Sequence, residues 1–147
     1  MRIGVIHGPN LHLLGKREPG VYGTLSLSEI NERLKTRART LGVTVETRQS
    51  NSEGEIVSWI GEGESWYDGL IINPAAYTHT SIAIRDALLA VSLPTIEVHL
   101  SNIHKREAFR QVSYVAPVVL GTISGLGPYG YELAMLALVH HVQKASP

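Results

Sequence analysis

Short runs of apolar, often β-branched residues alternate along the chain with longer stretches of helical period. The short runs have the length of β-strands, and the longer stretches repeat apolar residues at helical spacing. No low-complexity segment, charge block or internal repeat interrupts this order. The pattern therefore predicts repeated strand–helix units. The predicted strands are Arg2–His7, 43–49, Gly69–Asn73, 95–100 and 118–123.

Helix signals lie between these predicted strands. Ser26 and Glu29 have the spacing of a capping box, ahead of a helix that Gly42 can end. A later helix has to stop before Pro94, because the residue preceding a proline disfavours helical geometry. The helices predicted after Gly42 cover residues 55–62, 81–91, 105–112 and 129–144, and the second of these is the one that stops before Pro94.

Five strands joined through helices predict an α/β fold. Since such crossovers are almost always right-handed, we expect a flavodoxin-like three-layer sandwich with a five-stranded parallel sheet. The 147 residues suit a single catalytic domain spanning 1–147. A chain of this length can bury most of its apolar surface without help from disulfides or metals.

The charge balance narrows the class of partner. Thirteen basic residues match thirteen acidic ones, so no net field gathers nucleic acid or an anionic membrane, and a small molecule is the expected partner. The absence of cysteine excludes disulfides, thiolate catalysis and sulfur-based zinc sites. The N-terminus lacks the apolar region of a signal peptide, and no apolar run has membrane-spanning length. We therefore expect a cytoplasmic protein.

Polar side chains follow three of the predicted strands. His7 to Asn10 follow the first strand, Asn73 and Pro74 end the third, and Glu97 to Ser101 lie in and after the fourth. In an open parallel sheet, ligands bind outside the carboxyl ends of the strands, so these segments are expected to converge. This convergence favours an enzyme.

The fourth strand carries the clearest local chemistry. Alternation along a strand places Glu97, His99 and Ser101 on one face. A carboxylate two residues from an imidazole can orient the ring and stabilise its protonated form, so His99 is a candidate general acid. This segment alone is equally compatible with a structural Glu–His pair at a strand end.

The loop between the first strand and its helix contains a candidate base. Three glycines, at positions 15, 20 and 23, bracket Arg17 and Tyr22 on a segment that could close over a substrate. A tyrosine normally holds its proton up to a pH near 10, so ionising it at pH 7 costs roughly 4 kcal/mol. An adjacent arginine offsets much of this cost. The alternative is a solvated basic loop with an anchoring tyrosine.

Two other kinds of site are weaker. Seven histidines invite a metal site, but no His-Glu-x-x-His pattern occurs, and scattered structural histidines explain them better. Gly125, Gly127 and Gly130 match the dinucleotide fingerprint, yet the chain ends before the strand and acidic residue that such a site needs. A flavodoxin-like nucleotide- or phosphate-binding module stays as the alternative function. A phosphate-receiving domain, however, would carry aspartate in place of Asn73.

Long ordered motifs give a more specific indication. They are Gly8-Pro9-Asn10-Leu11, Leu14-Gly15, Arg17-Glu18-Pro19, Tyr22-Gly23, Asn73 to Ser81, Glu97 to Asn102, Arg106-Glu107, Phe109-Arg110 and Gly125-Leu126-Gly127. With these motifs the chain resembles the type II 3-dehydroquinate dehydratases from the first strand to the last helix. The resemblance implies dehydration of 3-dehydroquinate to 3-dehydroshikimate through an enolate. It also implies no Schiff base, metal or organic cofactor.

The resemblance assigns roles to the reacting side chains. Tyr22 would remove the proton next to the ketone, with Arg17 favouring its phenolate. Asn10 would hold a water at the enolate oxygen, and His99, oriented by Glu97, would protonate the departing hydroxyl.

The remaining family assignments concern substrate binding and assembly. Those for the substrate's carboxylate and hydroxyls are Asn73, His79, the Leu100 and Ser101 backbone, and Arg110. Asp86 would reach the site of a neighbouring subunit, which implies a homododecamer built from trimers. His7 and His12 stand where the family pattern has asparagines, and we interpret both as tolerated variants.

Overall fold

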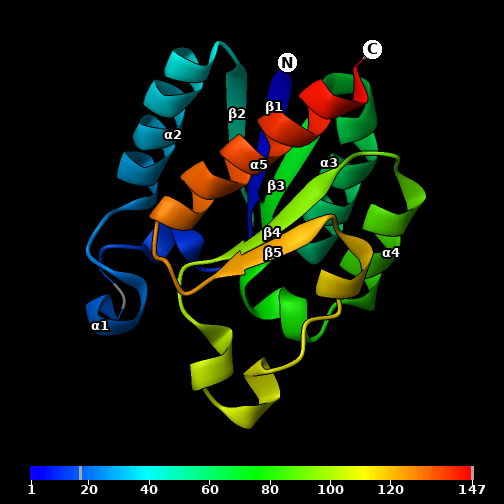
Figure 1. Cartoon of the computed structure of the whole chain (residues 1–147). Coiled ribbons are helices and arrows are strands. Elements are labelled where there is room, and N and C mark those ends of the chain that lie inside the picture. The colour runs from blue at the N-terminus through cyan, green and yellow to red at the C-terminus, as the bar shows by residue number, and fades with distance from the viewer. Residues whose placement is uncertain (17, 147) are drawn as a thin grey trace.

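The protein forms one parallel β-sheet between two layers of helices (Figure 1). This computed structural model describes residues 1–16 and 18–146. The strand order is β2-β1-β3-β4-β5, and every neighbouring pair is parallel. The strands are β1 (Arg2–His7), β2 (Thr44–Gln49), β3 (Gly69–Asn73), β4 (Thr95–His99) and β5 (Gly121–Ser124). The expected α/β, flavodoxin-like sandwich is confirmed.

Four long α-helices cover the two faces of the sheet, and a short α-helix lies in the loop after β1, following the 3-10 turn η1 (Leu11–Leu13) (Figure 1). The short helix is α1 (Pro19–Tyr22), which the sequence pattern did not predict. The long ones are α2 (Leu27–Leu41), α3 (Glu53–Trp66), α4 (Ile82–Ala90) and α5 (Tyr129–Ala145). Both termini lie at the end of the sheet opposite to the carboxyl ends of β1, β3 and β4.

Two apolar clusters hold the layers together. On one face, Ile3 and Val5 of β1 pack with Tyr131 of α5 and with α2. On the other face, Ile6 of β1 and Ile72 of β3 pack with α3 and α4. Each buried aliphatic side chain stabilises the fold by about 1.5–3 kcal/mol, so the alternation along the strands fixes both layers.

The signals at the ends of α2 are confirmed. Ser26 Oγ accepts a hydrogen bond from the Glu29 amide at 3.1 Å, and Glu29 Oε2 accepts one from the Ser26 amide at 2.8 Å. Gly42 ends the helix in the left-handed conformation, with φ of 69°. None of the helices in residues 1–16 and 18–146 combines the length and apolarity that a membrane span requires.

The predicted helix over residues 105–112 is wrong. The structure has two separate 3-10 turns there, η3 (Ile103–Lys105) and η4 (Ala108–Arg110), with extended backbone at Arg106. A helix over this segment would need an apolar face to bury, but Phe109 and Val112 are 68% and 60% exposed. The segment instead forms an irregular wall beside the carboxyl ends of the strands.

The predicted start of the fifth strand is also wrong. Residues Ala116–Val118 form the 3-10 turn η5, and β5 begins only at Gly121. Pro117 explains the difference, because its fixed φ and missing N–H favour the start of a helical turn and cannot donate to a sheet. The other predicted elements occur in the structure with small shifts of their ends.

Candidate active site

A cleft lies at the carboxyl ends of β1, β3 and β4. It holds about 570 Å³ of space, part of it open to solvent. Its lining contains most of the side chains that the sequence predicted for a site: Asn10, Tyr22, Asn73, His79, His99, Leu100, Ser101 and Arg110. The expected convergence of the strand ends is therefore observed, and it is the geometric basis of the candidate active site.

The floor of the cleft depends on a close approach between two chain segments. The Gly8 amide donates a hydrogen bond of 2.7 Å to the Asn73 carbonyl, which joins the segment after β1 to the end of β3. A Cβ atom at position 8 would lie 2.5 Å from the Pro74 carbonyl oxygen, so only glycine fits here. This contact places Asn10 and Asn73 in the same cleft.

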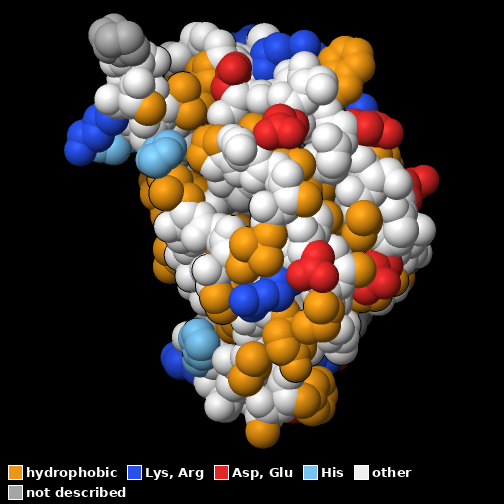
Figure 2. Space-filling model, turned by 90° about the vertical axis from the view of Figure 1, so that its right-hand side faces the viewer, with side chains coloured by type: hydrophobic (Ala, Val, Ile, Leu, Met, Phe, Trp, Pro, Cys, Tyr) orange, Lys and Arg blue, Asp and Glu red, His pale blue; other side chains and the backbone are white. Residues whose placement is uncertain are grey.

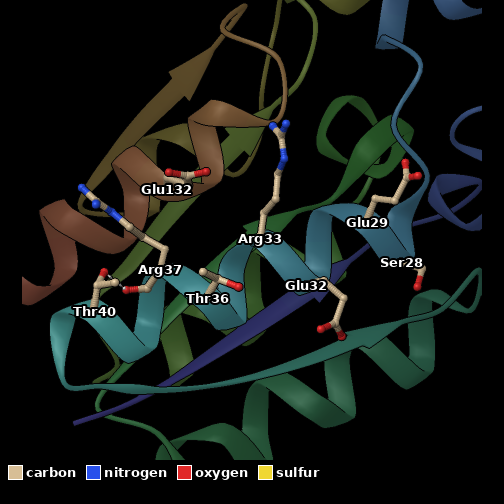
Figure 3. Close-up of a pocket in the computed structure, with 8 residues that line it drawn as sticks. All are labelled: Ser28, Glu29, Glu32, Arg33, Thr36, Arg37, Thr40 and Glu132. Atoms are coloured by element: carbon tan, nitrogen blue, oxygen red, sulfur yellow. Dashed lines mark hydrogen bonds between the residues drawn. The ribbon is translucent and has the colours of Figure 1, made fainter.

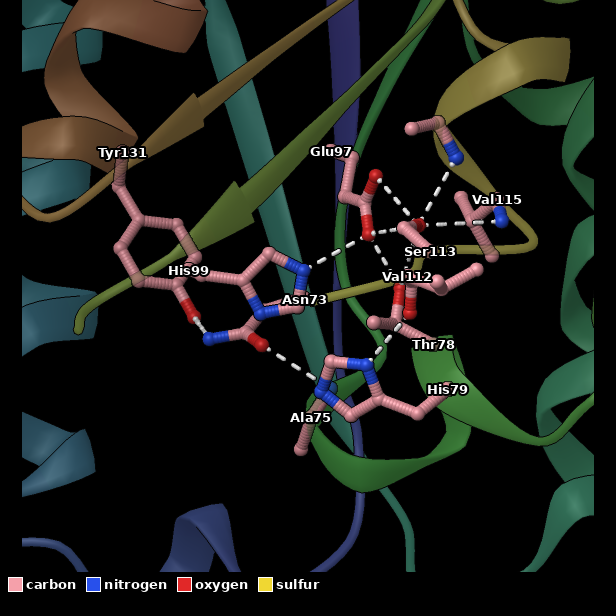
Figure 4. Close-up of polar contacts among 11 residues, drawn as sticks. Asn73, Ala75, Thr78, His79, Glu97, His99, Val112, Ser113, Val115 and Tyr131 are labelled. Atoms are coloured by element: carbon pink, nitrogen blue, oxygen red, sulfur yellow. Dashed lines mark hydrogen bonds and ion pairs between the residues drawn. The ribbon is translucent and has the colours of Figure 1, made fainter. Parts of the chain in front are cut away.

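The pair predicted on β4 is present and buried. His99 Nε2 lies 2.7 Å from Glu97 Oε1, and Figure 4 shows the two side chains joined. Because the carboxylate accepts this bond, Nε2 carries a proton and Nδ1 is left for other partners. The two rings of His79 and His99 stack 6.4 Å apart between centroids.

Two hydroxyl groups hold Glu97 from behind. Thr78 Oγ1 donates to Glu97 Oε1, and Ser113 Oγ lies 2.8 Å from the same oxygen (Figure 4). Burial by itself raises the pKa of the Glu97 carboxyl. The hydrogen bond and electrostatic attraction to His99 lower this pKa, as do the hydrogen bonds from Thr78 and Ser113, and the net result is a pKa below the ordinary value. Glu97 is therefore ionised at neutral pH and keeps His99 in a fixed orientation.

His79 reaches the cleft from η2 (Ala75–His79). Its Nδ1 donates to the Val112 carbonyl at 2.7 Å, so Nδ1 carries the proton. Burial lowers the pKa of His79, which keeps the ring neutral at pH 7. A neutral ring in this orientation leaves Nε2 as a hydrogen-bond acceptor.

Tyr22 has an arginine partner that the sequence pattern did not assign. Arg106 Nη1 donates to Tyr22 Oη at 2.9 Å, and the guanidinium carbon lies 5.2 Å from the centre of the tyrosine ring. Both side chains line the cleft. The two residues are 84 positions apart, so no local spacing could pair them. The motif containing Arg106-Glu107 was the one signal that marked this segment.

Three further predicted residues occupy different settings. Asn10 takes the left-handed conformation, with φ of 67°, and its backbone N–H donates to Asn51 Oδ1 at 3.0 Å. Arg110, the last residue of η4, lines the cleft. Its Nε donates a hydrogen bond to the carboxylate of Glu107, which directly precedes η4. Ser101 follows β4 and is half-buried at the cleft wall.

Of the predicted residues that the structure describes, Glu97 lies behind His99 and Asp86 lies outside the cleft. Asp86 lies on α4 with an exposed side chain and does not line the cleft. Arg17 lies outside the described residues. Among residues 1–16 and 18–146, no three His, Asp or Glu side chains group as metal ligands.

A larger surface groove lies elsewhere, between α2 and α5 (Figure 3). Its lining runs along α2 from Ser28 to Thr40 and includes Glu132 of α5. The ionisable residues described in its lining are arginines and glutamates that are exposed or half-buried, and none forms a buried pair like Glu97 and His99. The cleft at the strand ends is therefore the better candidate site.

The glycines of the fingerprint-like motif form a turn after β5. Gly125 and Gly127 have φ of 87° and 61°. Their amides donate to the carbonyls of His99 and Leu100, at 3.2 and 3.0 Å. These two amides are occupied by the end of β4 and are not directed at a phosphate site, which agrees with the interpretation of the glycines as turn residues.

Comparison with known proteins connects this cleft to a family. The type II dehydroquinase from Butyrivibrio crossotus superimposes with a TM-score of 0.93 at 45% identity, over 95% of this chain and 97% of its own. The type II dehydroquinase from Propionibacterium acnes superimposes with a TM-score of 0.89 at 46% identity, over 97% of this chain and 96% of its own.

Sequence relatives agree with the structural ones. The 3-dehydroquinate dehydratase of Aeromonas salmonicida is 57% identical over 98% of this chain and 97% of its own length. The 3-dehydroquinate dehydratase of Acaryochloris marina is 55% identical over 95% of this chain and 93% of its own length. The model of the family "Dehydroquinase class II" matches residues 1–139. The resemblance seen in the sequence is confirmed, and the chain belongs to the class II dehydroquinases.

Proposed function

We propose that this protein dehydrates 3-dehydroquinate to 3-dehydroshikimate by a trans elimination through an enolate. The observation that carries the proposal is the lining of one cleft by Tyr22 with its arginine partner and by His99 with its buried carboxylate. A base and an acid on different elements can act on the two ends of one elimination.

Tyr22 is the proposed base. As a phenolate it takes the proton from the carbon next to the substrate's ketone, and the electron pair left behind forms the enolate. Arg106, 2.9 Å from the hydroxyl, favours the ionised form by its charge. Arg17 is proposed to provide a second positive charge that stabilises the Tyr22 phenolate.

The enolate oxygen needs a donor as its charge develops. Asn10 is proposed to hold a water molecule at this oxygen, so that the water donates the hydrogen bond. The left-handed backbone of Asn10 and the bond from its amide to Asn51 support this role, because they fix the residue at the rim of the cleft.

His99 is the proposed acid. Its imidazolium form, stabilised by Glu97, donates the Nδ1 proton to the departing hydroxyl as the carbon–oxygen bond breaks. The products are the conjugated enone and one water molecule. The proton on Tyr22 then returns to His99 through solvent, which restores both groups.

The proposed substrate contacts use the other cleft residues. Arg110 is suited to the carboxylate, since its guanidinium already binds the Glu107 carboxylate and can exchange it for another. Asn73, His79 and the Leu100–Ser101 backbone are assigned to the hydroxyls and the carboxylate. No metal or organic cofactor has a role in these steps.

We also propose that the active form is a homododecamer built from trimers, with Asp86 reaching a neighbouring subunit's cleft. Ile82, Asp86 and Leu89 share one face of α4 at positions i, i+4 and i+7, and all three are exposed. Figure 2 shows apolar side chains gathered over this face of the molecule, around charged ones. An apolar stripe with a central carboxylate is suited to a subunit interface.

The proposal is tested by adding 3-dehydroquinate to the purified protein and recording ultraviolet absorbance. The conjugated enone product should make the absorbance rise, and pretreatment with substrate and borohydride should leave the rate unchanged. No rise with folded protein would reject the activity. Inactivation by borohydride would indicate a lysine Schiff base. A bound flavin spectrum or stable phosphorylation without turnover would favour the binding-module alternative.

A further inference from the structure

A buried imidazole and a buried phenol lie behind the cleft, and the proposed elimination uses neither. His7 ends β1 and Tyr131 lies in the first turn of α5, and both are fully buried. His7 Nδ1 lies 2.9 Å from Tyr131 Oη, and His7 Nε2 lies 2.8 Å from Asn31 Oδ1. Tyr131 Oη is also 3.0 Å from Asn73 Nδ2, so this pair contacts a residue of the cleft.

One backbone amide sets the direction of the hydrogen bond between Asn73 and Tyr131. The Ala75 N–H can only donate, and it lies 3.0 Å from Asn73 Oδ1, which must therefore accept. The amide nitrogen of Asn73 is then the atom that faces Tyr131, as Figure 4 shows.

The same reasoning extends to His7. Asn31 Oδ1 can only accept, so His7 Nε2 donates to it and carries the proton of the neutral ring. Nδ1 is then unprotonated and accepts the proton of Tyr131 Oη, which itself accepts from Asn73 Nδ2. The four side chains form one directed chain with a single arrangement of protons.

Within the described residues, this arrangement leaves one N–H of Asn73 without a protein acceptor. A side-chain amide carries two N–H groups, and Tyr131 takes only one of them. Asn73 lines the cleft, so the second N–H is available there. If these hydrogen bonds ran in the opposite direction, the Asn73 side chain would turn its oxygen toward Tyr131 and lose the hydrogen bond from the Ala75 N–H.

We propose that His7 and Tyr131 are positioning residues, which hold Asn73 so that its amide offers an N–H to an oxygen of the bound substrate. The identity of that substrate rests on the proposed function. Burial supports the proposal because it keeps both groups uncharged. It lowers the pKa of His7 to about 4, against the opposing effect of the bond to Asn31, and it raises the pKa of Tyr131.

Tyr131→Phe tests the proposal because it removes one hydroxyl and keeps the ring in the core. We expect KM for 3-dehydroquinate to rise about tenfold, with kcat changed by less than about twofold, since Asn73 binds substrate and transition state alike. His7→Met should have the same effect. His7→Gln can still accept from Tyr131 and donate to Asn31, so it should restore KM to near the wild-type value.

The control is Met135→Leu, a buried substitution one turn along α5 with no polar contact to change. It should leave KM unchanged even if it alters stability. An unchanged KM in folded Tyr131→Phe or His7→Met would overturn the proposal, and so would a loss of kcat alone.

A second measurement needs no turnover and no variant. Long-range ¹H–¹⁵N NMR of the wild-type protein at pH 7 should show His7 as the neutral tautomer protonated on Nε2. A ring protonated on Nδ1, or a charged ring, would contradict the directed chain. If the tautomer is as expected and the protein does not turn over 3-dehydroquinate, the proposed function fails while the geometry stands.

Discussion

At the scale of single residues, the charge beside Tyr22 has the largest expected effect on the reaction. Arg106 donates to the tyrosine hydroxyl and also lies over its ring. An opposite charge at this distance stabilises an ionised phenol far more than a neutral donor does. The guanidinium is therefore proposed to act on the base and not only on the shape of the cleft.

Replacing this charge should slow the reaction. In Arg106→Gln we expect kcat at pH 7 to fall about 10- to 100-fold, because a neutral amide replaces the positive charge beside the reacting oxygen of Tyr22. Steady-state kinetics measure this effect. Arg33→Gln, an exposed arginine of α2 outside the cleft, is the matched control. Equal rates for Arg106→Gln and the wild type would contradict the role.

The residues of the site differ in how far the sequence could predict them. The Glu97–His99 pair follows from strand alternation, and the structure has it at 2.7 Å. The contacts of Arg106, Thr78 and Ser113 were not predictable, since they join segments that only the tertiary fold brings together. Their roles follow from long-range packing, which no local pattern contains.

At the scale of elements, the approach of β1 to β3 determines whether the cleft forms. The segment after β1 touches the end of β3 backbone to backbone at Gly8, with no space for a side chain. The elements themselves were largely predictable, because capping residues and apolar periodicity act locally. The wall formed by η3 and η4 was not, because its polar sequence has no buried face to define a helix.

A methyl group at this contact should separate the two segments. Gly8→Ala should lower the free energy of unfolding by about 1–3 kcal/mol and reduce kcat/KM, because Asn10 and Asn73 move apart. Urea denaturation and kinetics test this expectation. Gly61→Ala in α3 is the control, since a Cβ there meets nothing within 4 Å, and it should raise stability by up to about 1 kcal/mol. Full stability and activity in Gly8→Ala would refute the steric argument.

At the scale of the whole molecule, the buried His7 links stability to pH. Its pKa is lowered from 6.5 to about 4 in the folded protein by burial. The unfolded chain therefore binds more protons than the folded one between these values, and stability falls as the pH drops through this window. The contribution is complete above pH 6.5.

Unfolding measurements at several pH values test this linkage. Between pH 7 and pH 4 the wild type should lose about 3 kcal/mol more stability than His7→Gln, since one fewer group gains a proton on unfolding in the variant. The acid sensitivity due to Glu97 is common to both proteins and cancels. Parallel pH profiles for the two proteins would show that His7 is not held neutral.

The proposed homododecamer has a native mass that can be measured. Twelve chains of 16.0 kDa give a native mass of about 190 kDa by light scattering. Leu89→Glu should dissociate the particle, because it places a charge within the apolar stripe of α4. Asp86→Asn should preserve the mass and reduce activity. A monomeric active wild type, or full activity in Asp86→Asn, would contradict the proposed contribution of Asp86.

Hydrogen exchange in D2O distinguishes a base and a separate acid that act from two sides of one cleft. His99→Gln should incorporate deuterium into recovered 3-dehydroquinate at the carbon next to the ketone, because Tyr22 still forms the enolate while the hydroxyl cannot leave. Tyr22→Phe should incorporate none beyond the rate without enzyme. Equal exchange in both variants, or exchange in Tyr22→Phe alone, would contradict the account.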